Sequence, residues 1–195
     1  MGDTKAIDLG DLGVICMQIA AFDADEDENG NKIPISWVAQ QLLVPAHNMN
    51  SSDTNANGYA ASAMKTYIDG LKSRLPAIVQ SMIVPTVKTS RDYNGGTPQD
   101  ITSTLELWIP SYREVFGGTS YEQSGPVYSS LFVNASSRKK QRYGTSSATS
   151  WWLRSAYPST ASSFAIVGSG GGSSSGGAGF ASGVAFGFCT GAAQS

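Results

Sequence analysis

Apolar positions near the start of the chain predict two strands that pair as a hairpin. Residues 13–22 are apolar and partly β-branched, which is typical of a strand. A charged segment follows, and its Asn29-Gly30 dipeptide is a strong signal for a tight turn between two strands. Residues 32–44 are the expected partner strand, with Trp37 in the core.

The middle of the chain predicts short helices and strands in alternation. In residues 58–75, apolar side chains recur at helical spacing, and Pro76 is expected to help end this amphipathic helix. Further along, the pattern predicts a short helix running into a strand at 77–88, a strand at 104–109 and a helical segment at 110–116 that starts with Pro110. The connecting segments are a polar, turn-rich stretch at 48–57, a turn at 92–98 and an irregular region at 117–147 with one apolar knot at 131–133.

The C-terminal tail, residues 149–195, has an unusual pattern. Two apolar segments, 151–155 and 183–189, flank the run 168–179, in which every residue is Gly, Ser or Ala. No charged residue follows Arg154. Composition alone would indicate a flexible linker. The bulky segments on both sides instead predict a long surface loop that is held at each end by a buried strand.

Charge and cysteine content narrow the classes of function. The chain has 195 residues, fits one domain, and carries a net charge of −2, so no global basic field favours nucleic acid. A basic cluster at Arg138, Lys139, Lys140 and Arg142 is expected to be a solvated loop, with an anion site as the alternative. The two cysteines, Cys16 and Cys189, are expected to be buried free thiols. The N-terminal residues do not have the pattern of a signal peptide, so we expect none, and no apolar run is long enough to predict a membrane-spanning helix.

Candidate chemistry is sparse. Asp25, Asp27 and Asn29 match the start of a calcium loop, but Ser36 occupies the position of the bidentate glutamate, which favours a plain charged turn. The single histidine, His47, has no recognisable catalytic partner and is expected to be structural. Catalytic and phosphate-binding motifs are not found. We therefore expect a binding protein, not an enzyme, with no catalytic residue, no metal site and no cofactor.

Several segments occur in an order that resembles a known kind of domain. They are Leu107–Gly117, Tyr121-Glu122, Ser137–Lys139, the Trp-Trp-Leu-Arg-Ser signature at 151–155, and Gly183–Cys189. The series resembles a domain of phages and their bacterial hosts with a C-type lectin fold of the formylglycine-generating-enzyme type. The resemblance implies an α+β fold for residues 1–195, in which two helices pack on small twisted antiparallel sheets with long irregular loops. The terminal strands are expected to lie together.

The tail is also similar to the variable proteins of diversity-generating retroelements. In those systems, adenines in a template are miscopied, so that Asn codons are changed into codons for other residues. The resemblance implies a variable region at 149–190, with a fixed scaffold made of Trp151, Leu153, Arg154, Ile166, Val167, Val184 and Phe186. The implied ligand-binding positions are Tyr157, Ser159, Thr160, Ser162, Ser163, Ala165, Gly168, Ser169, Gly172, Ser174, Ser175, Gly176, Gly177, Gly179, Phe180 and Ser182.

The resemblance further implies a receptor-binding or surface-display protein on a phage tail or a bacterial cell. Its partner would be a protein or glycan on a cell surface, without nucleic acid or membrane insertion, and phage tail proteins suggest a trimer by analogy. The expected surface has only Tyr157 and Phe180 as aromatic anchors, which indicates weak binding in this copy. Calcium-dependent sugar binding and the oxidase activity of the fold are not implied. The alternative is a structural virion or surface domain whose small-residue loop does not vary.

Overall fold

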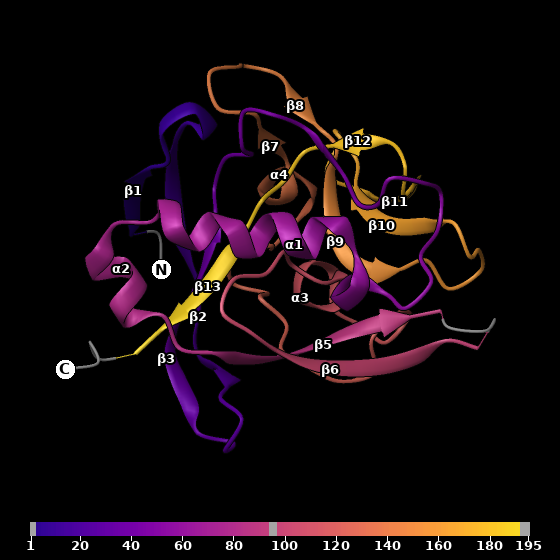
Figure 1. Ribbon diagram of the computed structural model, residues 1–195, viewed down its shortest axis with the longest axis horizontal. Helices are drawn as coiled ribbons and strands as arrows, with labels where there is room; N and C mark the ends of the chain where they lie inside the picture. The colour runs from indigo at the N-terminus through magenta and orange to yellow at the C-terminus, as the bar shows by residue number, and fades with distance from the viewer. Residues whose placement is uncertain (1–2, 94–96, 192–195) are drawn as a thin grey trace.

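The computed structural model describes residues 3–93 and 97–191, which form a mixed α and β protein with mostly small antiparallel sheets and few helices (Figure 1). The strands are β1 (Thr4–Asp8), β2 (Val14–Glu26), β3 (Lys32–Ala39), β4 (His47–Asn48), β5 (Thr86–Asp92), β6 (Gln99–Leu105), β7 (Lys140–Gln141), β8 (Ala148–Thr149), β9 (Trp151–Ala156), β10 (Ser163–Val167), β11 (Ser173–Gly177), β12 (Ala181–Ser182) and β13 (Gly187–Thr190). The helices are α1 (Ala63–Gly70), α2 (Ala77–Met82), α3 (Tyr112–Phe116) and α4 (Ala135–Arg138), with 3-10 turns at Gly10–Leu12, Tyr59–Ala61 and Leu71–Arg74.

The largest sheet has the strand order β1-β2-β3-β13, so β13 pairs with β3, while β1 lies at the opposite edge. The terminal strands, expected to lie together, thus share one sheet but do not pair with each other. The predicted β2–β3 hairpin is confirmed: Gly30 has a φ of 80°, and Asp27 Oδ1 accepts hydrogen bonds from the backbone N–H groups of Asn29 (2.8 Å) and Asn31 (2.9 Å). The Asp27 side chain therefore satisfies two backbone N–H groups of the turn. Trp37 was expected in the core but is only half-buried, because its ring lies on a sheet face that a helix covers incompletely.

The predicted long helix at 58–75 is divided into three pieces. Gly58 has a φ of 63°, outside the helical region, and Ser62 caps α1 by accepting a hydrogen bond from the backbone N–H of Lys65 at 3.1 Å. After α1, a 3-10 turn continues to Arg74. The expected helix running into a strand is confirmed by α2 and β5, and Pro76 caps the start of α2.

The strand expected at 104–109 is largely wrong. Strand β6 ends at Leu105, because it follows the pairing with β5 from Thr86↔Leu105 to Asp92↔Gln99. The expected turn at 92–98 lies between these strands, and its central residues 94–96 are outside the described part of the chain. Helix α3 is confirmed, but it begins after a capping box made by Ser111 and Glu114 instead of at Pro110.

The basic cluster is not the solvated loop that its sequence predicts. Lys139 is exposed, but Arg138 is half-buried and donates from Nε to the carbonyl of Gly171 at 2.9 Å. Lys140 is 4% exposed, and its Nζ lies 5.4 Å from the centre of the Trp151 ring. The segment pairs β7 with β8, so it contributes inward-facing side chains to the core beside the tail.

Strands β9, β10 and β11 form a separate three-stranded sheet in the order β11-β10-β9, on the side of the molecule opposite α2 (Figure 1). The short β12–β4 pair joins the tail to the segment around His47. Cys16 and Cys189 are free thiols; Cys189 is buried and Cys16 only partly so. No helix in residues 3–93 and 97–191 is long and apolar enough to cross a membrane.

Candidate functional site

The Gly/Ser run of the tail, expected to be an irregular loop, contains a regular strand. Strands β10 and β11 pair without a register shift from Ser163↔Gly177 to Val167↔Ser173. The N–H of Gly168 donates to the carbonyl of Gly172 at 2.8 Å, and the N–H of Ala178 donates to that of Ser162 at 2.9 Å. Since the direction of these groups alternates along a strand, the backbone of Ser174 and Gly176 faces β10, and that of Ser173 and Ser175 faces the open edge of the sheet.

Most of the candidate ligand-binding residues lie on the surface of this sheet and its turns. The exposed candidates are Ser159, Thr160, Ser169, Gly172, Ser174, Ser175 and Phe180. The partly buried candidates are Tyr157, Ser162, Ser163, Gly168, Gly176, Gly177 and Gly179. Two candidates are corrected: Ala165 is 0% exposed and Ser182 is 8% exposed, so neither side chain belongs to an accessible surface. Ala165 lies in the core, and the Ser182 hydroxyl lies 3.0 Å from that of Ser150.

The two aromatic candidates lie at one end of the three-stranded sheet. The N–H of Tyr157 donates to Ser163, the N–H of Phe180 donates to Gly177, and Ser163 and Gly177 are paired across β10 and β11. Phe180 is 69% exposed. Tyr157 packs partly against the core, with its ring 6.2 Å from that of Tyr121 in an edge-on arrangement. Phe180 is therefore the more accessible of the two aromatic candidates.

A polar segment far away in the sequence supports this end of the sheet. Asn55 is fully buried, and its side-chain amide donates to the carbonyls of Thr160 (2.7 Å) and Ser163 (2.8 Å). Asp53 accepts a hydrogen bond from the N–H of Gly179 at 2.8 Å. The sequence predicts a turn-rich loop here, but no local pattern indicates that its side chains hold the tail in place.

The Trp-Trp-Leu-Arg-Ser segment anchors the other side of the tail. As β9 it is buried along its whole length. Trp151 donates from Nε1 to the carbonyl of Arg138 at 3.0 Å, and Trp152 donates to that of His47 at 2.8 Å. His47 stacks on Tyr67 with ring centres 4.2 Å apart. Both indole N–H groups are thus satisfied, and the strand that carries the tail is fixed in the core.

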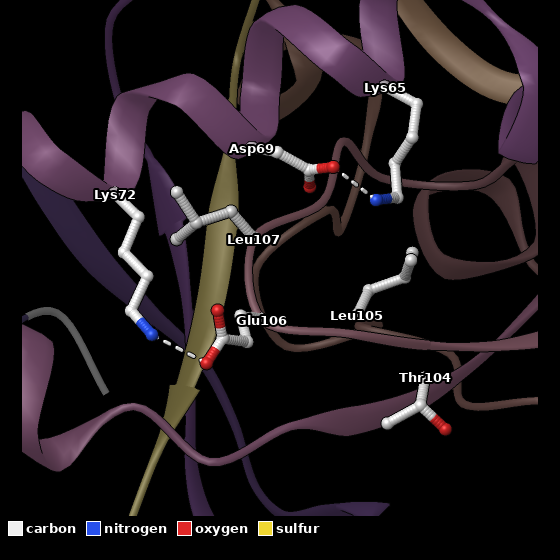
Figure 2. Close-up of a pocket in the computed structure, with 7 residues that line it drawn as sticks. All are labelled: Lys65, Asp69, Lys72, Thr104, Leu105, Glu106 and Leu107. Carbon is white, nitrogen blue, oxygen red and sulfur yellow. Dashed lines mark hydrogen bonds and ion pairs between the residues drawn. The ribbon is translucent and has the colours of Figure 1, made fainter.

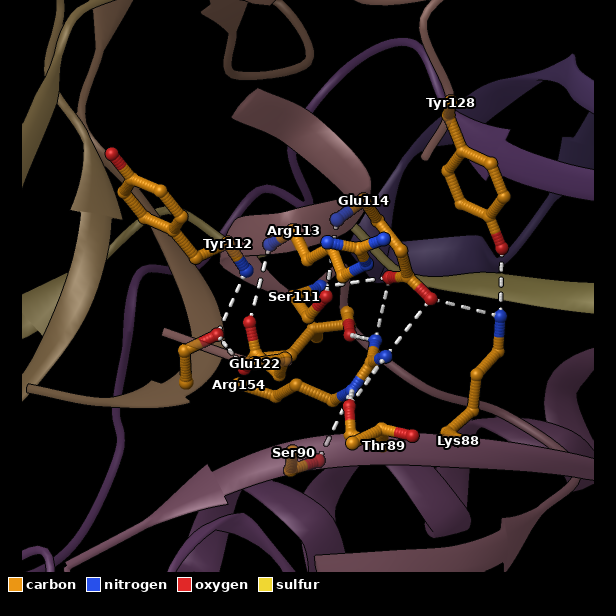
Figure 3. Close-up of polar contacts among 12 residues, drawn as sticks. Lys88, Thr89, Ser90, Ser111, Tyr112, Arg113, Glu114, Glu122, Tyr128 and Arg154 are labelled. Atoms are coloured by element: carbon orange, nitrogen blue, oxygen red, sulfur yellow. Dashed lines mark hydrogen bonds and ion pairs between the residues drawn. The ribbon is translucent and has the colours of Figure 1, made fainter. Parts of the chain in front are cut away.

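Arg154, the last charged residue of the chain, belongs to a buried network of charges with Glu114, Lys88 and Asp25. Figure 3 shows Arg154, Glu114 and Lys88. Its Nη1 and Nη2 atoms donate to the two carboxylate oxygens of Glu114 at 2.6 and 2.8 Å. Lys88 Nζ lies 3.0 Å from Glu114 Oε1 and 2.6 Å from Asp25 Oδ1. Two positive and two negative side chains are therefore paired inside the protein, and the buried Glu122 adds a further carboxylate whose charge acts on Arg154.

The network sets the pKa values of its carboxylates. Burial by itself would raise the pKa of Glu114, but the adjacent Arg154 and Lys88 charges lower it below its ordinary value. The pKa of Asp25 is lowered in the same way by Lys88, against the opposing effect of burial. Both carboxylates are thus ionised at neutral pH and make the attractive pairs that their burial requires.

Asp25 and Asp27, which match the start of a calcium loop in the sequence, do not face a common site in the structure. Its carboxylate points into the core, where it accepts hydrogen bonds from Tyr128 at 2.6 Å and Ser36 at 2.5 Å, while Asp27 closes the exposed turn. Cys189 Sγ lies 3.6 Å from Asp25, and burial raises the pKa of this thiol to about 11. The thiol is therefore protonated at neutral pH and poorly nucleophilic. Within the described residues, no group of three or more His, Cys, Asp or Glu side chains is placed to hold a metal ion.

A polar cleft of about 330 Å³ lies between the end of α1 and the segment after β6 (Figure 2). Its charged side chains are matched: Lys65 pairs with Asp69 at 2.5 Å, and Lys72 pairs with Glu106 at 2.5 Å. Because each positive charge already has a negative neighbour, the cleft presents no surplus charge with which to select an ion. The tail surface remains the stronger candidate site.

Lys140 makes the stability of the fold depend on pH. Burial lowers the pKa of Lys140 to about 7, below the ordinary 10.5. Between these values the unfolded chain binds a proton that the folded chain does not, so stability rises with pH in this window. From pH 7 to 8.5, the free energy of unfolding is expected to rise by roughly 1.5 kcal/mol from this group. Denaturant unfolding at several pH values measures the slope.

Lys140→Met should flatten that slope, and Lys139→Met, at the exposed neighbouring position, should leave it unchanged. An equal slope in both variants and in the parent would show that Lys140 is not the group that titrates.

The sequence profile of one family, described as "Domain of unknown function (DUF6273)", matches residues 36–186. No curated protein matches the chain, and no solved structure does. The matched region starts in β3 and includes β9, the whole β10–β11 hairpin and most of the buried network.

Proposed function

The chain belongs to the DUF6273 family, and from this premise we propose that it is a ligand-binding protein whose recognition surface is built by the C-terminal tail. The observation that carries the proposal is the contrast between the two paired strands of the β10–β11 hairpin. The exposed residues of β11, Ser173, Ser174 and Ser175, have small, uncharged side chains, whereas the paired strand β10 contributes Phe164, Ala165 and Val167 to the core. Such a surface can change its contacts at little cost in stability.

We further propose that the fold is of the C-type lectin type. The pairing of β13 with β3 supports this, because it brings the end of the chain to the sheet that the first strands form. The long stretches outside strands and helices, held by side-chain hydrogen bonds such as those of Asn55, also support it. In this proposal the tail lies on a scaffold of small sheets and short helices, on a phage virion or a bacterial cell surface.

We propose that the exposed tail positions are diversified by a retroelement. Packing supports a division between free and fixed positions: a Cβ atom at Gly172 would meet no atom within 4 Å, whereas a Cβ at Gly183 would lie 2.4 Å from Leu42 and one at Gly187 would lie 2.5 Å from Trp108. Small, adaptable residues with a few aromatic anchors are also the composition of antibody binding loops. Ser173, which is exposed beside Ser174 and Ser175, is as open to change as its neighbours.

Sequencing the gene from independent isolates tests this function. We expect substitutions to concentrate at the exposed tail residues, such as Ser159, Ser174 and Phe180, and to spare the buried Ala165 and Ser182 beside them. A near-copy of the coding region next to a reverse transcriptase gene should accompany the variation. Substitutions spread evenly over the chain would instead indicate a structural domain whose tail does not vary.

A further inference from the structure

An apolar groove lies between α2 and the four-stranded sheet, on the side of the molecule away from the β10–β11 hairpin (Figure 1). Its volume is about 290 Å³, close to the lower limit of roughly 300 Å³ for small-molecule pockets. Met17, Trp37 and Phe188 line it from the sheet, and Ile78, Val79 and Met82 line it from α2. The groove is therefore a cavity of suitable size with apolar walls.

Helix α2 covers this part of the sheet without sealing it. None of its six residues is buried, and Ile78 is 64% exposed. The chain after α2 is nevertheless fixed, because the N–H of Val84 donates to the carbonyl of Cys189 at 3.0 Å. The groove thus remains open under a helix whose end is held against β13.

The groove has one charged lining residue, Lys5, which is exposed on the edge strand β1 and is paired in register with Met17. Within the described residues, no carboxylate lies within ion-pairing distance of Lys5. The site therefore combines apolar walls with a single positively charged lining residue. That combination complements a molecule with one hydrocarbon chain and one negative head group.

We propose that this groove binds an anionic amphiphile with a single acyl chain, such as a medium-chain fatty acid. The acyl chain lies against Trp37 and the flexible side chain of Met82, which adapts to an irregular apolar surface. The carboxylate lies at Lys5. The hydrogen bond from Trp37 Nε1 to Thr190 Oγ1, at 3.0 Å, holds the indole in the wall of the groove. This inference does not depend on the function of the tail.

Fluorescence titration of the full chain with decanoate, below its micellar concentration, tests the proposal. Trp108, Trp151 and Trp152 are fully buried, so Trp37 is expected to report on the groove. We expect a saturable change in emission that is lost in Trp37→Phe, and a Kd that rises about fourfold for each methylene removed from the acid. No saturable change, or a Kd that does not depend on chain length, would overturn the proposal.

Three variants and a control separate the contribution of the apolar walls from that of Lys5. Val79→Trp should fill the groove and abolish binding, and Met82→Ala should weaken binding severalfold without overfilling the groove. The melting temperature of each variant checks that it folds.

Lys5→Gln should weaken the binding of decanoate about threefold, as expected for an exposed charge pair, and leave the binding of neutral decanol unchanged. Lys139→Gln should alter neither. Undiminished binding in both wall variants, or equal losses for decanoate and decanol in Lys5→Gln, would contradict it. Dimerisation that Val79→Trp abolishes would instead assign the groove to a second copy of the chain.

Discussion

Arg154→Met is expected to lower the free energy of unfolding by about 3–5 kcal/mol at neutral pH, because it leaves the Glu114 carboxylate buried without its bidentate partner. Arg154 is 1% exposed, and it also donates to the carbonyls of Thr89 (3.0 Å) and Ile109 (2.8 Å). Methionine preserves most of the side-chain volume, so the loss reports the missing charge and hydrogen bonds. Chemical denaturation monitored by circular dichroism measures it.

Arg113→Met is the matched control. Arg113 donates to the carbonyls of Gly125 (2.8 Å) and Gly118 (2.6 Å) at the surface and forms no ion pair with a described residue. Its replacement should cost no more than about 1–2 kcal/mol, the usual contribution of such hydrogen bonds. If Arg154→Met cost no more than this control, the four-charge network would not support the tail.

Gly171→Ala is expected to destabilise the protein by about 3 kcal/mol, since it adds both a strained backbone conformation and a steric clash. Gly171 has a φ of 83°, and a Cβ atom there would lie 1.8 Å from the carbonyl oxygen of Ala135. That oxygen is backbone, so it cannot move aside as a flexible side chain would. The shift in melting temperature and the denaturation midpoint measure the effect.

The adjacent Gly172→Ala provides the comparison. A Cβ atom at Gly172 would meet no atom within 4 Å, so its effect should stay within about 0.5 kcal/mol. Equal effects at the two positions would mean that the turn does not pack against α4, and that the Gly/Ser run lacks the fixed positions described here.

Local sequence patterns are sufficient to predict part of the fold. The Asn29-Gly30 hairpin and the strand at Trp151–Ser155 were predicted because each has its own signal: a turn dipeptide in one and a run of bulky side chains in the other. The strand β11 was missed, because Ser and Gly are poor indicators of a strand. It forms because β10 offers a hydrogen-bonding partner and small side chains fit there: a Cβ atom at Gly176 would already lie 3.1 Å from Trp152.

The buried charges could not be predicted from sequence. Asp25, Lys88, Glu114 and Arg154 come from four separate segments, and each by itself suggests an exposed residue. Only the tertiary structure brings them together as balanced pairs. Most of the candidate tail residues, in contrast, lie on the surface as predicted. The exceptions are Ala165, which follows the buried Phe164 in β10, and Ser182 in β12, and no local pattern marks either of them as buried.

Amide hydrogen exchange along β11, measured residue by residue by NMR, most directly tests the claim that the charge-free tail is a rigid recognition surface. The structure predicts alternation: slow exchange at Ser174 and Gly176, whose N–H groups face β10, and fast exchange at Ser173 and Ser175, whose N–H groups face the open edge. Exchange at all four amides at the rate of an unstructured chain would contradict the account, because the Gly/Ser run would then be a flexible linker.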